Sequence, residues 1–238
     1  MASDLQVLRS RRGTPKRVWV LARVCAGLAA LSAQPSALAA SPDSSIDFRC
    51  QGGGRAADEM IDACDRVIAS GGGTRLSTAQ ALMDRANHLA TKHEYDKAIE
   101  DYNRSIALGS GGTTAAFFNR GLAYVAKGDD AQAIQDFDEQ IRRTPSYDEA
   151  FYQRGMIWMR RRQFDAAICD FDAVISFYDS FADKYGYRGN LVKALYRRGQ
   201  ARLGIRDLGG AIDDFGRAVK IEPWIADFHA IAHWLKGD

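Results

Sequence analysis

The stretch FFNRGLAYVAKGDDAQAIQDFDEQIRRTP, residues 117–145, decides the fold, because edited copies of it recur along the chain. Each copy has an alanine followed by isoleucine, an aromatic residue four positions after that alanine, and a small residue twelve positions before it. The alanines are Ala98, Ala133, Ala167 and Ala211, the aromatics are Tyr102, Phe137, Phe171 and Phe215, and the small residues are Ala86, Gly121, Gly155 and Gly199. The alanines are 35, 34 and 44 residues apart, which indicates an internal repeat.

The spacing within each copy predicts a pair of packed helices. Residues four apart share one face of a helix, so the alanine and the aromatic residue lie together on the second helix of each pair. The small residue on the first helix allows the second helix to approach closely. A single helix pair cannot bury its apolar face alone, so successive pairs must stack on one another.

This pattern resembles the tetratricopeptide repeat, a 34-residue helix–turn–helix unit written W-x₂-L-G-x₂-Y…A-x₃-F…P. The copy quoted above matches it at Phe117, Gly121, Tyr124, Ala133, Phe137 and Pro145. The resemblance implies an all-α, right-handed superhelical solenoid of such repeats with a C-terminal capping helix. In this family the first helices line a concave groove that receives peptides or partner helices.

The resemblance divides most of the chain into repeats. We expect four of them within 78–224, at about 79–110, 114–147, 148–180 and 192–224. The 44-residue spacing places ten extra residues in the region 179–190, as either a lengthened helix or a protruding loop. Residues 225–238 are predicted to form the capping helix that such stacks need.

Residues 1–39 have the features of a signal peptide. Six basic residues and one acidic residue precede the apolar run 24–33, which at 10 residues is too short for the roughly 20 that span a bilayer. Ala37-Leu38-Ala39 is a small-x-small cleavage site, which predicts a mature start at Ala40. We therefore expect an exported, periplasmic protein with no membrane span after cleavage. A secreted protein and one anchored to the inner membrane by its signal are the alternatives.

Residues 40–77 are predicted to form an N-terminal half-repeat. Met60, Cys64 and Val67 have the spacing of the alanine, the aromatic residue and the small residue after it, so they indicate a second helix without its partner. In an oxidising compartment Cys50 and Cys64 can form a disulfide, worth about 3 kcal/mol for a loop of this size. The alternative is two free thiols. If the disulfide forms, Cys169 is the odd cysteine.

Composition and charge restrict the classes of partner. The chain of 238 residues is 46% hydrophobic and has 5 prolines, as in a folded protein. Without residues 1–39 it has 26 basic and 29 acidic residues, so its net charge is −3 and no nucleic-acid surface is indicated. We expect a protein or peptide partner, and the oligomeric state is left open.

Two sets of residues could suggest catalysis. An aspartate precedes each repeat aromatic: Asp101, Asp136, Asp170 and Asp214. These lie on successive second helices, where we expect solvated side chains rather than the converging pair that acid–base chemistry requires. His229 and His233 could reach one metal ion, but no glutamate has the H-E-x-x-H spacing and no third ligand is evident. No catalytic residue, metal or cofactor is predicted, and a metal-dependent enzyme using this histidine pair is a remote alternative.

The predicted binding surface lies on the first helices. Its residues occupy one face of each: Met83, Asn87, Phe118, Leu122, Tyr152, Met156, Met159, Tyr196, Gln200 and Leu203. Apolar, methionine-rich and aromatic side chains suit an adaptable binding groove, although several could simply pack between neighbouring helices. The resemblance thus implies a non-enzymatic interaction scaffold, and the signal peptide predicts that it works in the cell envelope. The alternative is an accessory subunit or chaperone that uses its convex face or the 179–190 insertion.

One variant of the family's groove can be tested against the sequence. Some members hold a peptide C-terminus in a carboxylate clamp of asparagines and cations. Asn87 and Asn119 remain in the matching columns, but Met83, Glu149 and Gln153 stand where the cations would be. A clamp is therefore not expected there, although Lys193 and Arg197 could provide a displaced one.

Overall fold

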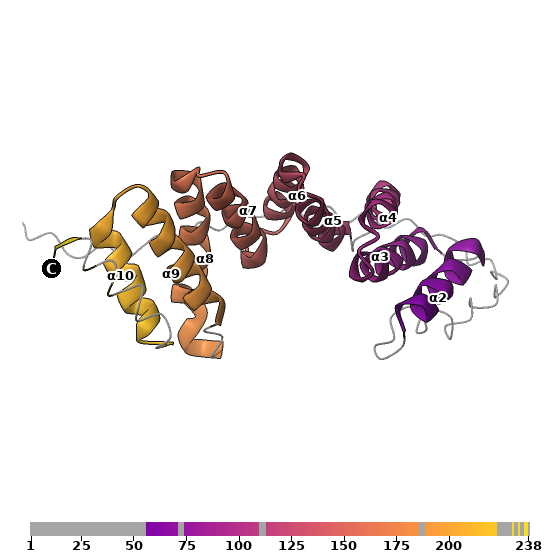
Figure 1. Ribbon diagram of the computed structural model, residues 1–238. Helices are drawn as coiled ribbons and strands as arrows, with labels where there is room; N and C mark the ends of the chain where they lie inside the picture. Colours follow the sequence, from indigo (N-terminus) through magenta and orange to yellow (C-terminus); the bar gives the residue numbers. More distant parts are fainter. Residues whose placement is uncertain are drawn as a thin grey trace, which may run out of the picture. The chain divides into compact units, whose positions relative to one another are not determined.

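The computed structural model describes residues 56–70, 74–109, 113–185, 189–222, 230, 233, 236 and 237, without the side chains of 113 and 181–189. The predicted signal peptide, residues 1–39, and most of the predicted capping helix, 225–238, lie outside the described residues. Across the described ranges the regular secondary structure is entirely α-helical (Figure 1).

The helices follow one another as packed neighbours along the chain. They are α2 (Ala57–Ser70), α3 (Arg75–Thr91), α4 (Tyr95–Leu108), α5 (Thr113–Lys127), α6 (Asp130–Arg143), α7 (Asp148–Arg160), α8 (Phe164–Tyr185), α9 (Gly189–Gly204) and α10 (Leu208–Val219). Each helix contacts the next, and first helices of neighbouring pairs also touch, α3 with α5 and α7 with α9. The pairs α3–α4, α5–α6, α7–α8 and α9–α10 are helix–turn–helix units. The predicted all-α solenoid of tetratricopeptide-like repeats is confirmed.

Each pair is joined by a tight turn that contains one left-handed residue. This position has φ of 61° at His93, 80° at Gly128, 58° at Arg162 and 63° at Arg206. Glycine adopts this conformation freely, whereas the other three residues are strained in it. In two of the pairs the second helix then begins at a capped position: the side chains of Asp129 and Asp207 accept hydrogen bonds from backbone N–H groups three residues ahead, which stabilises the starts of α6 and α10.

The core of each pair is the contact between a buried ring and a small residue. Tyr102, Phe137, Phe171 and Phe215 are at most 1% exposed. A Cβ atom added at Gly121, Gly155 or Gly199 would lie 2.6–2.8 Å from a carbon of the facing ring. These glycines therefore permit the close helix approach, and Ala86 occupies the same position opposite Tyr102 in the first pair.

The extra residues of the 44-residue spacing lengthen a helix. Of the two alternatives for the region 179–190, the lengthened helix is observed as far as Tyr185, since α8 continues to that residue. The extension is tied to its neighbours at its base. The hydroxyl of Tyr178 donates to Asp148 at 2.7 Å, and the guanidinium of Arg217 binds Asp179 at 2.7 Å.

Helix α2 packs against α3 at the N-terminal end of the described chain. Met60, Ala63, Cys64 and Val67 are its buried residues. Cys64 is fully buried and is not a free thiol, but Cys50 lies outside the described residues, so the Cys50–Cys64 disulfide stays a prediction. Cys169 is an exposed free cysteine.

The aspartates before the aromatic residues are buried, so the expectation that they are solvated was wrong. Their exposed fractions lie between 1% and 4%. Each carboxylate is bound by an arginine of the first helix, 16 residues earlier, through both Nε and a terminal nitrogen. The pairs are Arg85–Asp101, Arg120–Asp136, Arg154–Asp170 and Arg198–Asp214, with Nε–oxygen distances of 2.6, 2.9, 3.0 and 2.9 Å.

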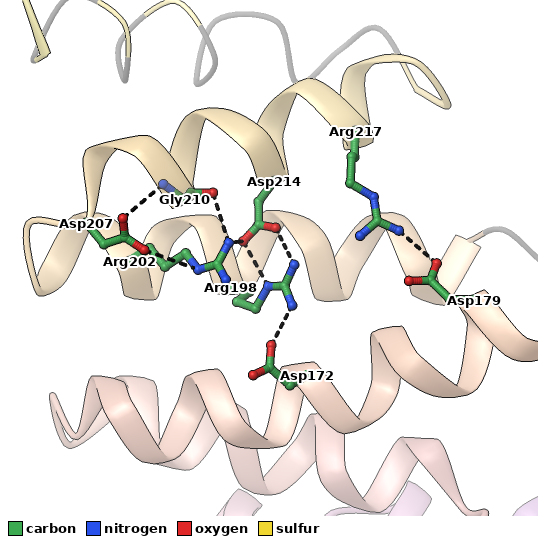
Figure 2. Close-up of polar contacts among 8 residues, drawn as sticks. All are labelled: Asp172, Asp179, Arg198, Arg202, Asp207, Gly210, Asp214 and Arg217. Carbon is green, nitrogen blue, oxygen red and sulfur yellow. Dashed lines mark hydrogen bonds and ion pairs between the residues drawn. The ribbon is translucent and has the colours of Figure 1, made fainter. Parts of the chain in front are cut away.

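The same arginines also bind the preceding repeat. The second terminal nitrogen of Arg85, Arg120, Arg154 and Arg198 donates to Asp65, Asn103, Asp138 and Asp172, respectively. Figure 2 shows this arrangement for Arg198, which lies between Asp214 on α10 and Asp172 on α8. We call these four arginines and their partners the arginine ladder. It joins the two helices of a repeat and also joins successive repeats.

At each end of the arginine ladder, the position that would bind a further arginine holds an uncharged residue. Ala63 of α2 stands where each complete repeat has its buried aspartate, and Gly216 of α10 stands where earlier repeats have Asn103, Asp138 or Asp172. A further arginine-bearing helix would find no acceptor at either position. The ladder thus spans the four helix pairs and the half-pair α2.

Arg154 provides the test of this arrangement. We expect Arg154→Met to lower the free energy of unfolding by about 3 kcal/mol, because a buried carboxylate then loses its counter-charge. The Asp170 side chain is 5% exposed, and burial already raises its pKa above the usual value. Urea denaturation at pH 7 measures the loss.

Two further variants serve as controls. Replacing both members, Arg154→Met with Asp170→Leu, should recover most of the lost stability, because no charge is then left buried. Arg142 is itself largely exposed and binds the partly exposed Glu139, so Arg142→Met should leave the unfolding free energy almost unchanged. Equal losses in Arg154→Met and Arg142→Met would contradict a structural role for the ladder.

Candidate functional site

The predicted groove residues lie at the border between core and solvent. Nine of them are partly exposed: Met83, Asn87, Leu122, Tyr152, Met156, Met159, Tyr196, Gln200 and Leu203. We call these nine residues the first-helix face. Several pack with one side against the core of their own pair, and the rings of Tyr152 and Tyr196 lie 5.8 and 6.0 Å from those of Phe171 and Phe215. Their positions are therefore fixed by the same aromatic residues that hold each repeat together.

Phe118 is the exception, because it belongs to the core. It is 7% exposed, and its ring centroid lies 5.7 Å from that of Phe137 and 5.0 Å from that of Tyr147. Tyr147, in the loop before α7, covers the side that would otherwise face outward. Phe118 therefore offers little surface to a partner and is better described as a packing residue.

A pocket of about 480 Å³ opens between α3 and α5, the first helices of the first two repeats. We call it the α3–α5 pocket. Its lining residues are Asn87, Ala90, Tyr95, Tyr102, Asn119, Leu122, Ala123 and Ala126. Small apolar side chains dominate this lining, and none of its residues is charged. The pocket therefore suits a neutral polar group flanked by apolar atoms, rather than an ion.

Two asparagines from different helices meet in the α3–α5 pocket. The Oδ1 atom of Asn87 on α3 accepts a hydrogen bond from Asn119 Nδ2 on α5 at 2.9 Å. The same oxygen accepts a second hydrogen bond from the Tyr102 hydroxyl at 2.6 Å. The Nδ2 of Asn87 and the Oδ1 of Asn119 have no partner among the described residues, so a donor and an acceptor are left for a ligand.

The neutral lining argues against a carboxylate clamp at this place. Asn87 and Asn119 lie together, as the two asparagines of a carboxylate clamp do. No cation lies beside them in the pocket lining, so the negative charge of a peptide C-terminus would be buried without a counter-charge. Arg197 lies on α9, where its guanidinium covers the Tyr196 ring at 5.4 Å and donates to Gln200 at 3.0 Å. A displaced clamp with Lys193 stays a prediction.

The sequence indicated only part of this pocket. Asn87 and Leu122 were expected on the binding face, and Tyr102 was identified as a structural residue only. The signal for its second role is visible in the sequence: Tyr102 is the single tyrosine in a column of phenylalanines, and only its hydroxyl can reach the pocket. Tyr95, which begins α4, was not expected in the pocket.

The histidine pair can be only half located. His233 is partly buried, and His229 lies outside the described residues. In the part of the chain that the structure covers, no three histidine, cysteine, aspartate or glutamate side chains are grouped as metal ligands. Over the same residues, no helix has both the length and the apolar character needed to cross a bilayer.

The repeat geometry agrees with a comparison to known families. A family model described as the tetratricopeptide repeat matches residues 118–180, which include α6 and α7 and parts of α5 and α8. The chain thus carries tetratricopeptide repeats over residues 118–180. No curated protein matches the chain.

Solved structures of other tetratricopeptide repeat proteins share the fold of this chain. The C-terminal part of a repeat-containing protein from Cytophaga hutchinsonii aligns with a TM-score of 0.65 and 19% identity, over 79% of this chain and 69% of that one. MamA aligns with a TM-score of 0.61 and 20% identity, over 79% and 99%. YrrB, described as a TPR protein with an unusual peptide-binding site, aligns with a TM-score of 0.55 and 18% identity, over 76% and 84%. At these identities the likeness shows the fold alone.

The hydrogen bond between Tyr102 and Asn87 can be tested by measuring the free energy of unfolding of variants at these two positions. Asn87→Leu removes the acceptor of a buried hydroxyl, so we expect the free energy of unfolding to fall by about 1–3 kcal/mol. Adding Tyr102→Phe should restore most of it, because the second repeat already carries Leu122 and Phe137 in these two columns. Urea denaturation of the single and double variants measures the coupling. Additive losses would contradict a direct contact.

Proposed function

We propose that this tetratricopeptide repeat protein is a non-enzymatic protein–protein interaction scaffold of the cell envelope, which binds a peptide or helix along its first-helix face. The observation that carries the proposal is the α3–α5 pocket. It combines a neutral, largely apolar lining with an amide donor on Asn87 and an amide acceptor on Asn119. A peptide group offers the complementary acceptor and donor, and apolar side chains can fill the space beside it.

The other repeats supply surface for a longer ligand. Met156 and Met159 on α7 and Leu203 on α9 are partly exposed, and methionine adapts to ligands of different shape. YrrB, whose fold this chain shares, is described as having a peptide-binding site. That description supports a peptide ligand here by analogy of fold.

A second candidate uses another surface. The chain could act as an accessory subunit or chaperone of an envelope or secretion complex, with its convex face or the region 179–190 as the contact. The observation that favours it is the extension of α8, which Asp179 and Arg217 anchor at its base. A metal-dependent enzyme using His229 and His233 is the remote alternative, and a zinc titration of the full chain without binding would remove it.

The peptide-binding proposal predicts a specific effect of charge in the α3–α5 pocket. The full chain is screened against a displayed library of random, unmodified ten-residue peptides, and the affinity of a selected peptide is measured by fluorescence anisotropy. We expect Leu122→Arg to weaken binding at least tenfold, because the cation would be desolvated in a neutral pocket. Leu76→Arg is the matched control, since Leu76 is 56% exposed on α3 and does not line the pocket.

The possible outcomes separate the two surfaces. Loss of binding in Leu122→Arg alone supports the first-helix face. Retention of binding in both variants would exclude the α3–α5 pocket and favour the extension of α8, which can then be tested by Asp179→Arg. Failure to select any peptide would count against peptide binding.

The envelope location predicts a processed and oxidised chain. When the full chain is expressed in a bacterium with a periplasm, we expect mass spectrometry of the periplasmic fraction to find an N-terminus at Ala40. Alkylation without reductant should modify Cys169, and Cys50 and Cys64 should be modified only after reduction. An unprocessed chain in the cytoplasm, with all its cysteines reactive after unfolding, would refute the location.

A further inference from the structure

One hydroxyl distinguishes the first repeat from the other three. The buried aromatic residue of each repeat is phenylalanine at positions 137, 171 and 215, but it is Tyr102 in the first repeat. The hydroxyl of Tyr102 reaches the α3–α5 pocket. Tyr102 is 1% exposed, so this hydroxyl needs an acceptor within the protein. Asn87 Oδ1, at 2.6 Å, is that acceptor. Burial raises the pKa of the Tyr102 hydroxyl, which keeps it protonated and able to donate.

This hydrogen bond fixes the orientation of two amides. An asparagine amide can be turned in two ways, but only one of them presents an oxygen to the Tyr102 hydroxyl. The same oxygen then accepts from the Nδ2 atom of Asn119 at 2.9 Å, so the second amide is fixed as well. The outcome is a donor, Asn87 Nδ2, on the α3 side and an acceptor, Asn119 Oδ1, on the α5 side.

We infer that Tyr102 is a positioning residue that gives the α3–α5 pocket a polarity and thereby sets the direction in which a bound peptide runs. This inference rests on the proposed function. A residue in extended conformation presents its N–H and its C=O on the same side, with the N–H first along the chain. The C=O accepts from Asn87 and the N–H donates to Asn119. The ligand therefore runs from α5 towards α3, against the order of the repeats.

The other repeats cannot set this direction in the same way. Their corresponding pairs are Phe137 with Leu122, Phe171 with Met156, and Phe215 with Gln200, and in each the ring has no hydroxyl to orient a neighbour. The amide of Gln200 is already hydrogen-bonded to Arg197 and to the Tyr196 hydroxyl, so these repeats add mainly apolar contact along the ligand. The backbone direction is read between α3 and α5.

Peptides selected from the random ten-residue library give the direct test. Each is synthesised with a nitroxide at its N-terminus or at its C-terminus and added to the ¹⁵N-labelled full chain. With the wild type, we expect the N-terminal label to broaden amide signals of α7, and the C-terminal label to broaden those of α2. In Tyr102→Phe, we expect each label to broaden the signals of both α7 and α2. The side-chain amides of Asn87 and Asn119 can then turn, so the peptide binds in both directions. Affinity should fall severalfold, because the two amides are no longer held in the orientation that binds the peptide.

A backbone scan supplies a second measurement. Methylation of one particular peptide nitrogen should weaken binding to the wild type at least tenfold, because it removes the N–H that donates to Asn119. In Tyr102→Phe the same methylation should weaken binding less, because a peptide that binds in the other direction can place a different residue between the two amides. Tyr102→Phe keeps the ring that the other three repeats have, so circular dichroism should show an unchanged fold.

Tyr178→Phe is the matched control. It also removes a buried tyrosine hydroxyl, one that donates to Asp148 at 2.7 Å and does not line the pocket. Its peptide affinity and direction should equal those of the wild type.

The possible failures are distinguishable. If Tyr102→Phe keeps one direction and full affinity while Leu122→Arg abolishes binding, the role of Tyr102 is refuted and the groove stands. If the peptides run from α3 towards α5, the inferred polarity is refuted. If Leu122→Arg has no effect, or no peptide is selected, the proposed function fails and this inference fails with it.

Discussion

Each repeat depends on the contact between a buried aromatic ring and a facing residue with little or no side chain. At Gly155, for example, a single added Cβ atom would lie 2.8 Å from the ring of Phe171. The same approach determines the ionic contact, because Arg154 precedes the glycine and Asp170 precedes the ring. When the ring meets the glycine, the guanidinium is brought to the carboxylate. The apolar contact and the buried ion pair are therefore two parts of one interaction between two dipeptides.

This coupling explains which parts of the fold the sequence could reveal. The spacing of Ala133 and Phe137 places both residues on one helical face, and this local rule predicts the helix pairs without further knowledge. The pairing of Arg154 with Asp170 is different, because it joins residues of two helices and depends on how those helices face each other. Helical periodicity therefore showed the aspartates at the edge of the buried face but not their burial. The arginine before each small residue was visible in the sequence as a column.

The candidate site shows the same division. Asn87 and Leu122 could be placed on the binding face from their position on the first helices. Phe118 could not be distinguished from them, because the residue that covers it, Tyr147, comes from the loop before α7. Tyr102 was identified only as a core residue, since the distance of its hydroxyl from Asn87 depends on the packing of α4 against α3. One side chain can thus belong to the core by its ring and to the surface by its oxygen.

The arginine ladder has a consequence for how such a chain can change in length during evolution. An internal repeat, such as α5–α6, carries an arginine that binds the repeat before it and an acidic residue, Asp138, that binds the repeat after it. A tandem duplication of that gene segment would produce two copies whose charges match at the new junction. Duplication of the α9–α10 unit would instead place Gly216 opposite a new arginine. Growth of the array is therefore electrostatically favoured within its interior and disfavoured at its C-terminal end.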